Sequence, residues 1–415
     1  MWQHASSSAR TRGPGLPAWL GRLPALALLL LQAHCGPTVG PSTSTANERV
    51  PSPPAPASRV NVVDAVSSAD PDSVVIVAGG DVSLGRETGQ AILSDPDYEP
   101  FRAIAPVWKQ ADLRFVNLES QLSEQGGETQ SPKNRLIFCG PPGGARVLSR
   151  AGVNVVSLAN NHAWDYGRPA FFETLQYLEA ASVRHVGVGR HIAEAYAPQV
   201  FHIKGKTIAW FAVTHVWNYG PMKDHAGRRH VAWASLPALR PALVRARAEH
   251  DVVLVSYHGG AEYEPVPSGS TQRFVTAVMK LGVDAVLGHH PHVIQGIGWV
   301  EGRPAVYSLG NLVFGPRPKH PWTRFGMLAK LAIGPGSTRS LRVCPYRIEG
   351  QVPVPLSAQS EERAAFLQHL QQTSSGLGGS VLGDEDEQGC TRVLPPAARS
   401  AEPLKPSLVA YTPAL

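Results

Sequence analysis

The chain has 415 residues, of which 43% are hydrophobic and 17% are charged, with 40 glycines and 37 prolines. This composition is typical of a folded globular protein with one large domain or two ordinary ones and irregular ends. The formal net charge is +6, and no run of basic residues is interleaved with aromatic residues, so the sequence does not favour nucleic acid as a partner.

Residues 1–35 have the features of an export segment. Several arginines precede a short apolar run at 23–31, which is too short to span a membrane comfortably. Cys35 follows this run, as in a bacterial lipoprotein signal, although His34 stands where such signals normally have a small residue. We therefore expect an exported protein of the cell envelope or periplasm. Lipidation at Cys35, ordinary cleavage and an uncleaved membrane anchor remain alternatives.

Residues 36–72 are rich in Pro, Ser, Thr and Ala. Such a segment has too little apolar surface to form a packed core, so it is predicted to be a linker between the membrane and the folded part of the chain.

A folded domain is predicted over residues 73–350, where short apolar runs alternate with helical patterns. The expected strands begin at 73, 113, 153, 206, 251 and 283, and the expected helices cover 92–111, 144–151, 169–181, 236–249 and 270–281. Strands that alternate with helices of about a dozen residues indicate βαβ units and a largely parallel sheet that is buried on both faces. We therefore predict an α/β fold with helices on both sides of the sheet.

Residues 351–415 are predicted to form a C-terminal helix followed by a flexible tail. Two antiparallel strands at 325–333 and 341–348 are expected to close the sheet edge, a helix is expected at 360–372, and the tail is expected from residue 374 onward. No pair of the four cysteines has C-x-x-C spacing, which argues against a cysteine-based zinc or redox site. In an oxidising compartment, Cys344 with Cys390 is the most plausible disulfide.

Ligand-type side chains follow five of the predicted strands. In chain order these are Asp81; Asn117 and Glu119; Asn160, Asn161, His162 and Asp165; His258; and His289, His290 and His292. Open α/β sheets place their sites at the carboxyl ends of strands, so we expect these side chains to share one edge. Carboxylate and imidazole groups suit Mn, Fe and Zn, and a carboxylate can bridge two ions. Each motif alone also fits a helix cap or a turn, but the series predicts a centre for one or two divalent ions.

Six motifs resemble the CapA-type capsule synthesis family, also described as poly-γ-glutamate biosynthesis proteins. They are GGDVSLGR, FVNLES, SLANNHAWDYG, YHGGAEYEPVPS, VLGHHPHVIQG and AVYSLGNLVFG, in the order of the family and within about residues 74–333. That family is similar in fold to the calcineurin-like metallophosphoesterases. The resemblance therefore implies a layered sandwich of mostly parallel sheets and helices, with the site at the carboxyl ends of the strands.

The resemblance also implies roles for individual residues. Asp81 would be the first metal carboxylate, and Glu119, or alternatively Asn117, would replace the bridging aspartate. Asn161 would be an amide ligand, while His162 would donate a proton or stabilise the leaving oxygen.

Further roles follow from the later motifs. Asp165 would orient the ring of His162. His258 would be a metal ligand, as would the final pair, His290 and His292. His289 would help to orient its neighbours, unless the pattern shifts by one position and makes it a ligand itself. The candidates for contact with the substrate are Arg86, Asn117, Asn160, Glu262 and His289.

The chain departs from the phosphoesterase pattern at two motifs. Ser83 stands where D-x-H would supply an imidazole, and N-L-E replaces G-D-x-x-D. One of the two metal positions would consequently be weak, or a single ion would bind.

Two functions are consistent with these features. The first is a metal-dependent hydrolase or transferase that acts on an anionic cell-surface polymer or its precursor. The second is a non-catalytic polymer-handling or scaffold subunit of a membrane-bound capsule synthesis complex. The ligand set favours the first function, and the missing imidazole at Ser83 suits the second.

Overall fold

The computed structural model describes residues 72–334 and 339–396. The predicted export segment and Cys35 lie outside the described residues, as does nearly all of the predicted linker. Within the described ranges, no helix combines the length and the apolar character needed to cross a membrane.

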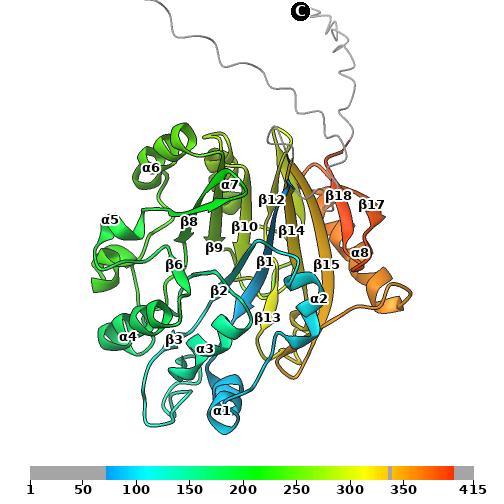
Figure 1. Ribbon diagram of the computed structural model, residues 1–415. Coiled ribbons are helices and arrows are strands. Elements are labelled where there is room, and N and C mark those ends of the chain that lie inside the picture. The colour runs from blue at the N-terminus through cyan, green and yellow to red at the C-terminus, as the bar shows by residue number, and fades with distance from the viewer. Residues whose placement is uncertain (1–71, 335–338, 397–415) are drawn as a thin grey trace, which may run out of the picture. The chain divides into compact units, whose positions relative to one another are not determined.

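Two β-sheets form the framework of the fold (Figure 1). The ten-stranded sheet has the order β17-β18-β15-β14-β1-β2-β5-β6, with β13 beside β1 and β16 beside β15. Its strands are β1 (Val74–Val82), β2 (Leu113–Leu118), β5 (Val155–Ser157), β6 (Arg184–Val186), β13 (Asn311–Val313), β14 (Phe325–Ile333), β15 (Arg339–Glu349), β16 (Val352–Pro355), β17 (Val381–Glu385) and β18 (Thr391–Leu394).

The six-stranded sheet has the order β11-β12-β10-β9-β8-β7. Its strands are β7 (Gln199–Ile203), β8 (Lys206–Thr214), β9 (Val252–His258), β10 (Ala285–His289), β11 (Ile297–Val300) and β12 (Arg303–Val306). A separate short pair consists of β3 (Gln121–Leu122) and β4 (Cys139–Gly140).

Eight helices of α type connect these strands in the described residues. They are α1 (Arg86–Ser94), α2 (Ala105–Trp108), α3 (Gly143–Arg150), α4 (Gly167–Ala180), α5 (Ile192–Ala195), α6 (Leu236–Glu249), α7 (Gly269–Met279) and α8 (Glu361–Ser375). Short 3₁₀ turns occur at η1 (Arg102–Ile104), η2 (Met222–Asp224), η3 (Ala226–Arg229) and η4 (Pro321–Arg324).

The predicted α/β class is confirmed, and parallel strands form the centre of the smaller sheet and one end of the larger sheet, from β1 to β6. Strand β1 is parallel to β2 and β13, and the series β8, β9, β10 and β12 is parallel throughout. Antiparallel strands extend these parallel parts, with β7 and β11 in the smaller sheet and β14 to β18 in the larger one.

The two sheets pack face to face. Successive side chains of a strand point to opposite faces, and in β8 this divides Trp210 from its neighbour Phe211. Trp210 joins the core that lies between the sheets, where its ring stacks on that of Phe115 in β2 at 4.4 Å between centroids. Phe211 joins a second core with Leu243 of α6 and Val275 of α7, so these helices cover the outer face of the smaller sheet.

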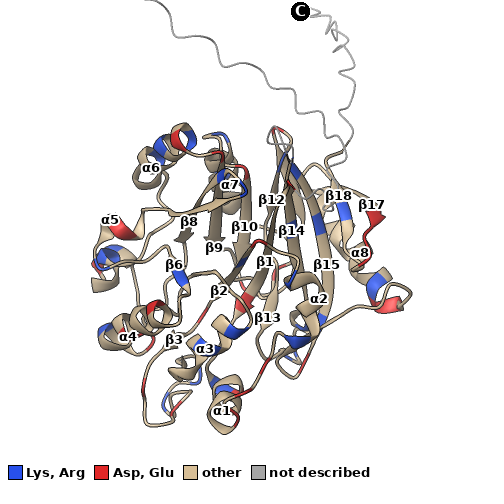
Figure 2. Cartoon of the chain, in the orientation of Figure 1, with Lys and Arg blue, Asp and Glu red and all other residues tan. Residues whose placement is uncertain are grey.

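Lysine and arginine residues are spread over several elements, among them α6, β6 and β15 (Figure 2). This distribution agrees with the modest net charge of the sequence.

Three expectations need correction. The helix predicted over 92–111 is instead α1, which ends at Ser94, followed by the short segments η1 and α2. Pro96, Pro100 and Pro106 interrupt this stretch, and proline removes a backbone donor and clashes within a helix.

The antiparallel strands also differ in position from the prediction. Strand β14 pairs with β1 inside the larger sheet and does not close its edge. The tail predicted from residue 374 contains β17 and β18, and β18 pairs with β15. The predicted disulfide between Cys344 and Cys390 is confirmed, and it fixes this C-terminal hairpin to β15.

Candidate metal centre

The carboxyl ends of strands from both sheets meet at the predicted site. Strand β1 supplies Asp81, and Asn117 of β2 lies beside it in register. Strand β9 ends in His258, which lies in register with His289 at the end of β10. The ligand-type side chains of two sheets therefore face one another across the interface between the sheets.

Glycines allow the strands that carry these residues to approach one another closely. A Cβ atom at Gly80, next to Asp81, would lie 1.9 Å from the carbonyl oxygen of Gly310. A Cβ at Gly288 would lie 1.8 Å from the carbonyl oxygen of Tyr307. Gly288 is therefore required for the close packing of β10 against the backbone of Tyr307.

Glu119 lies at the middle of the site and is fully buried. Its Oε1 atom is 3.8 Å from Nε2 of His162, 3.9 Å from Nε2 of His258 and 3.8 Å from Nε2 of His292. Neither of its carboxylate oxygens has a hydrogen-bond partner among the described residues. A buried carboxylate without a partner is costly, so this arrangement suits a bound cation.

Asp81 is also fully buried, but its oxygens have partners. The side-chain amide of Asn117 donates to Oδ1 at 2.8 Å, and the backbone N–H of His290 donates to Oδ2 at 3.1 Å. Nδ1 of His289 lies 3.4 Å from Oδ1, and Nδ1 of His292 lies 3.5 Å from Oδ2.

Two asparagines fix the ring of His258. Nδ1 of this ring lies 3.2 Å from the amide nitrogen of Asn117, and Nε2 lies 2.7 Å from the Oδ1 atom of Asn161. The amide of Asn161 in turn donates to Oδ1 of Asn218 at 3.1 Å. Asn161 and His258 thus approach the centre as a hydrogen-bonded pair.

The segment after β10 has a strained backbone. His290 has a φ of 96° and His292 a φ of 58°, in the left-handed region that residues other than glycine rarely occupy. Nδ1 of His292 lies 2.8 Å from Oδ1 of Asn311, so its Nε2 is directed toward Glu119.

Asp165 and Tyr219 orient the ring of His162. Nδ1 of His162 lies 2.8 Å from Oδ2 of Asp165, and the hydroxyl of Tyr219 donates to the other oxygen of Asp165 at 2.7 Å. Nε2 of His162 faces Glu119. Tyr219 thus takes part in the hydrogen bonds that position His162.

Burial shifts the pKa values of these groups in ways that favour metal ligation. Burial, together with His290, lowers the pKa of His258 well below its ordinary value. Burial lowers the pKa of His290 to about 4 and also lowers that of His292. These imidazoles are therefore neutral at pH 7, which is the form that binds a metal.

The residues that are present fit one or two divalent ions. Candidate ligand atoms of Glu119, His290 and His292 lie within 4.8 Å of one another, and so do those of Asp81, Glu119 and His258. Both groups contain Glu119, which is the residue predicted to bridge. Asn161 lies next to the second group through its contact with His258.

The residues predicted to contact the substrate lie at different depths. Asn117, Asn160 and His289 are completely buried, and Asn160 donates to the carbonyl oxygen of Leu118 at 2.8 Å. This burial favours a positioning role for these three.

Glu262 and Arg86 are more accessible. Glu262 is exposed on the loop after β9, and although partial burial raises its pKa, His292 and the Tyr263 hydroxyl lower it on balance. Arg86 is half-buried at the start of α1.

Sequence reasoning missed the role of Asn311 and the presence of Phe138 at the site. Asn311 holds the ring of His292 through a contact with its Nδ1 atom. Phe138 packs its ring 4.3 Å from that of His162. No local signal marks either residue, because each acts through a partner that is distant in sequence.

Comparisons with known proteins agree with the motifs. Residues 75–316, more than half of the chain, match the family described as bacterial capsule synthesis protein PGA_cap. The chain belongs to this family. The matched range contains every candidate ligand from Asp81 to His292.

Two curated relatives carry capsule or polymer synthesis names. The chain is 25% identical over 335 residues to the capsule biosynthesis protein CapA of Bacillus anthracis, covering 79% of this chain and 80% of the relative. It is 26% identical over 307 residues to the PGA biosynthesis protein CapA of Bacillus subtilis (strain 168), covering 71% and 77%.

Among solved structures, this capsule synthesis family member is similar to a putative 5′-nucleotidase from Staphylococcus aureus in complex with α-ketoglutarate. The TM-score is 0.41 at 13% identity, over 72% of this chain and 58% of that chain. Similarity at this level carries no functional argument.

Proposed function

We propose that this protein is an exported, metal-dependent hydrolase or transferase of capsule synthesis. Its substrate would be an anionic cell-surface polymer of the poly-γ-glutamate type, or the precursor of that polymer. The observation that carries this proposal is Glu119, a fully buried carboxylate that lacks a hydrogen-bond partner among the described residues and faces three imidazole nitrogens.

The ligands of the ion or ions would be Asp81, Glu119, Asn161, His258, His290 and His292. A divalent ion such as Mn, Fe or Zn, when bound, supplies Lewis-acid polarisation and lowers the pKa of bound water. The protein contributes a preformed, buried set of donors, because Asn117 and Asn311 already hold the rings of His258 and His292 in place.

His162 would be the residue that moves a proton. Its Nδ1 donates to the carboxylate of Asp165, and this leaves Nε2, on the side of Glu119, to exchange a proton with the leaving group. Burial and Asp165 raise the pKa of Tyr219, so its hydroxyl remains a donor that holds Asp165 in position.

Export is supported by the disulfide between Cys344 and Cys390. Disulfides persist in oxidising compartments and are rare in the cytosol. The capsule synthesis names of the curated relatives are consistent with a role in the cell envelope.

The test is the metal content and turnover of the full chain purified without a histidine tag. The variants are Asp81→Asn and Glu119→Gln, with Glu99→Gln as the control because Glu99 is exposed and outside the site. The assay uses a generic phosphodiester and poly-γ-glutamate. We expect the parent and the control to hold Mn, Fe or Zn and to be active, and both site variants to lose metal and activity. A folded parent without metal would refute the proposal.

A non-catalytic role in polymer handling or as a scaffold subunit is the second candidate. Ser83, where the related phosphoesterases supply an imidazole, accepts a hydrogen bond from the backbone N–H of Gly85 at 3.4 Å. The site thus has one imidazole fewer than the phosphoesterase pattern would supply. Stoichiometric metal without turnover on either substrate would favour this role.

A further inference from the structure

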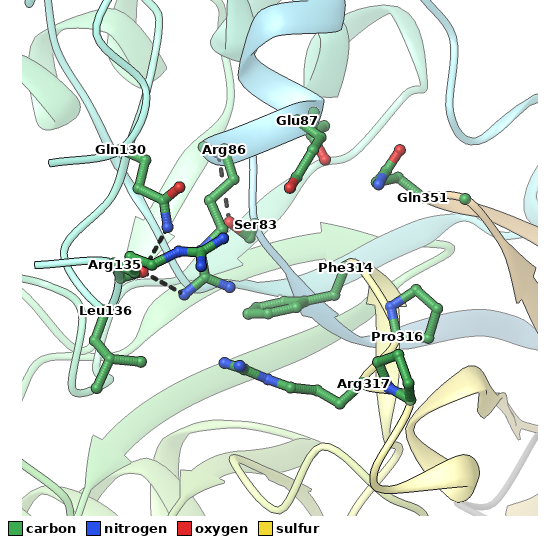
Figure 3. Close-up of a pocket in the computed structure, with 15 residues that line it drawn as sticks. Ser83, Arg86, Glu87, Gln130, Arg135, Leu136, Phe314, Pro316, Arg317 and Gln351 are labelled. Carbon is green, nitrogen blue, oxygen red and sulfur yellow. Dashed lines mark hydrogen bonds between the residues drawn. The ribbon is translucent and has the colours of Figure 1, made fainter. Parts of the chain in front are cut away.

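A pocket of about 600 Å³ opens beside the candidate metal centre. Its walls come from the start of α1, the loop before β4, the loop after β13 and the turn between β15 and β16 (Figure 3). Three arginines line it, Arg86, Arg135 and Arg317, against one carboxylate, that of Glu87. In Figure 3 Glu87 lies near Gln351, away from the guanidinium groups. We call this space the arginine pocket.

Arg86 is held in a fixed position in this pocket. Its backbone has a φ of 51°, and its N–H donates to the carbonyl oxygen of Thr129 at 2.8 Å. The guanidinium carbon lies 4.0 Å from the ring centroid of Phe138 and 5.7 Å from that of Phe314. Its Nη2 donates to the backbone carbonyl of Arg135 at 3.3 Å.

Carboxylates lie near the positive charge of this pocket without pairing with it: Glu87, Glu119 and Asp165 act to raise the pKa of Arg86, although burial lowers it on balance. Over residues 72–334 and 339–396, neither Arg86 nor Arg317 forms an ion pair, and the buried Nε of Arg86 has no hydrogen-bond partner. Burial and the nearby charge of Arg317 lower the pKa of Arg86. Two close, half-buried cations destabilise each other, and an anion between them would relieve this repulsion.

Aromatic rings connect the pocket with the metal centre. The ring of Phe138 contacts both Arg86 and His162, with 4.3 Å between the Phe138 and His162 centroids. The ring centroid of Phe314 lies 4.9 Å from that of His292. One aromatic ring therefore connects the guanidinium of Arg86 with the candidate proton-transfer residue.

We infer that the arginine pocket binds a carboxylate or phosphate group of the substrate, next to the bond that reaches the metal centre. This inference rests on the proposed function. Guanidinium groups form paired hydrogen bonds with carboxylate and phosphate oxygens, and the side chains of Arg86 and Arg317 both extend alongside the ring of Phe314 (Figure 3). A polymer with an anionic group in each repeating unit would thus occupy the centre and the pocket together.

Calorimetric titration of the full chain tests this inference. The ligands are a short γ-linked glutamate oligomer and inorganic phosphate, and the variants are Arg86→Gln and Arg317→Gln. Arg240→Gln is the control, because Arg240 is exposed on α6, outside the pocket. Since hydrogen bonds to charged groups contribute about 1.5–3 kcal/mol, each pocket variant should raise the Kd of the oligomer about 10- to 100-fold. The control should leave the Kd unchanged.

The metal content of the same samples separates this inference from the proposed function. Both pocket variants should keep the metal content of the parent. If the parent holds no metal and the pocket variants still bind the oligomer more weakly than the parent, the result would support the pocket and refute the metal proposal. Weakened binding of phosphate alone would identify a phosphorylated precursor as the source of the anion. Oligomer and phosphate binding as tight as in the parent for both variants would overturn the inference.

Discussion

Asp81 and Glu119 are both fully buried carboxylates, yet their surroundings shift their pKa values in opposite directions. Burial raises the pKa of Asp81, but His289, His292 and His258 outweigh this and lower it. Burial raises the pKa of Glu119, and the negative charges of Asp81 and Glu262 raise it further. Without a cation, Glu119 therefore favours its protonated form, and metal binding would have to displace that proton.

At the residue scale, we expect the stability of the metal-free protein to fall as the pH decreases from 6.5 to about 4. Burial lowers the pKa of His290 from 6.5 to about 4. Between these values the unfolded chain binds a proton that the folded chain does not. The free energy of unfolding therefore becomes smaller as the pH is lowered. Above pH 6.5 the His290 imidazole is neutral in both the folded and the unfolded chain, and its contribution to the free energy of unfolding is fully present.

The measurement is urea unfolding at several pH values in the presence of a chelator. His290→Asn removes the titrating group, and its free energy of unfolding should depend less steeply on pH in this window. Identical pH dependence in the parent and the variant would contradict the expected role of His290.

At the scale of elements, the packing of β10 depends on a glycine. Gly288→Ala places a Cβ where the carbonyl oxygen of Tyr307 lies 1.8 Å away, so the parallel pairing of β10 with β12 must shift. We expect a loss of about 3 kcal/mol or more in the free energy of unfolding, measured with urea. Gly376→Ala is the matched control because Gly376 has a φ of −70° and open space around its Cβ position. Equal stability of the two variants would contradict this account.

The disulfide provides a second test at this scale. Cys344 and Cys390 are separated by 46 residues, and their bond ties the β17–β18 hairpin to β15. A Cys344→Ser, Cys390→Ser double variant should lose about 2–4 kcal/mol of unfolding free energy. Reduction of the parent should have the same effect and should not change the double variant. Unfolding midpoints with and without reductant measure both, and an unchanged parent would contradict the prediction.

At the scale of the whole molecule, the centre joins the two sheets. Asp81 lies in β1 of the larger sheet, and Glu119 directly follows β2 of the same sheet. His258 ends β9 of the smaller sheet, and His290 directly follows β10. An ion held by these residues would cross-link the sheets and bind only the folded state.

Metal removal should therefore lower the stability of the whole domain. At a free metal concentration of one hundred times the Kd, the ion contributes about 2.7 kcal/mol. We expect a chelator to lower the Tm of the parent and to leave that of His290→Ala unchanged, as measured by scanning calorimetry. A chelator effect of equal size in both proteins would show that the stabilising ion binds elsewhere.

The α/β class and the disulfide partners could be identified from the sequence, and so could the candidate ligands that the fold brings together. Buried strands and helices leave local periodic patterns, and ligand-type residues at strand ends are visible one motif at a time. The prolines that break the helix predicted over 92–111 are also a local signal, and their missing backbone donors override the helical spacing of the apolar residues around them.

Only the tertiary structure decided which of these groups meet. The backbone of His290 reaches Asp81 across 209 positions, and Asn311 orients His292 across 19. The arginine pocket likewise joins residues from four separate segments. Such contacts arise from the packing of two sheets, and a chain pattern read over a dozen residues carries no information about them. The sequence therefore determined which chemistry is available, and the packing of the sheets decided where it is concentrated.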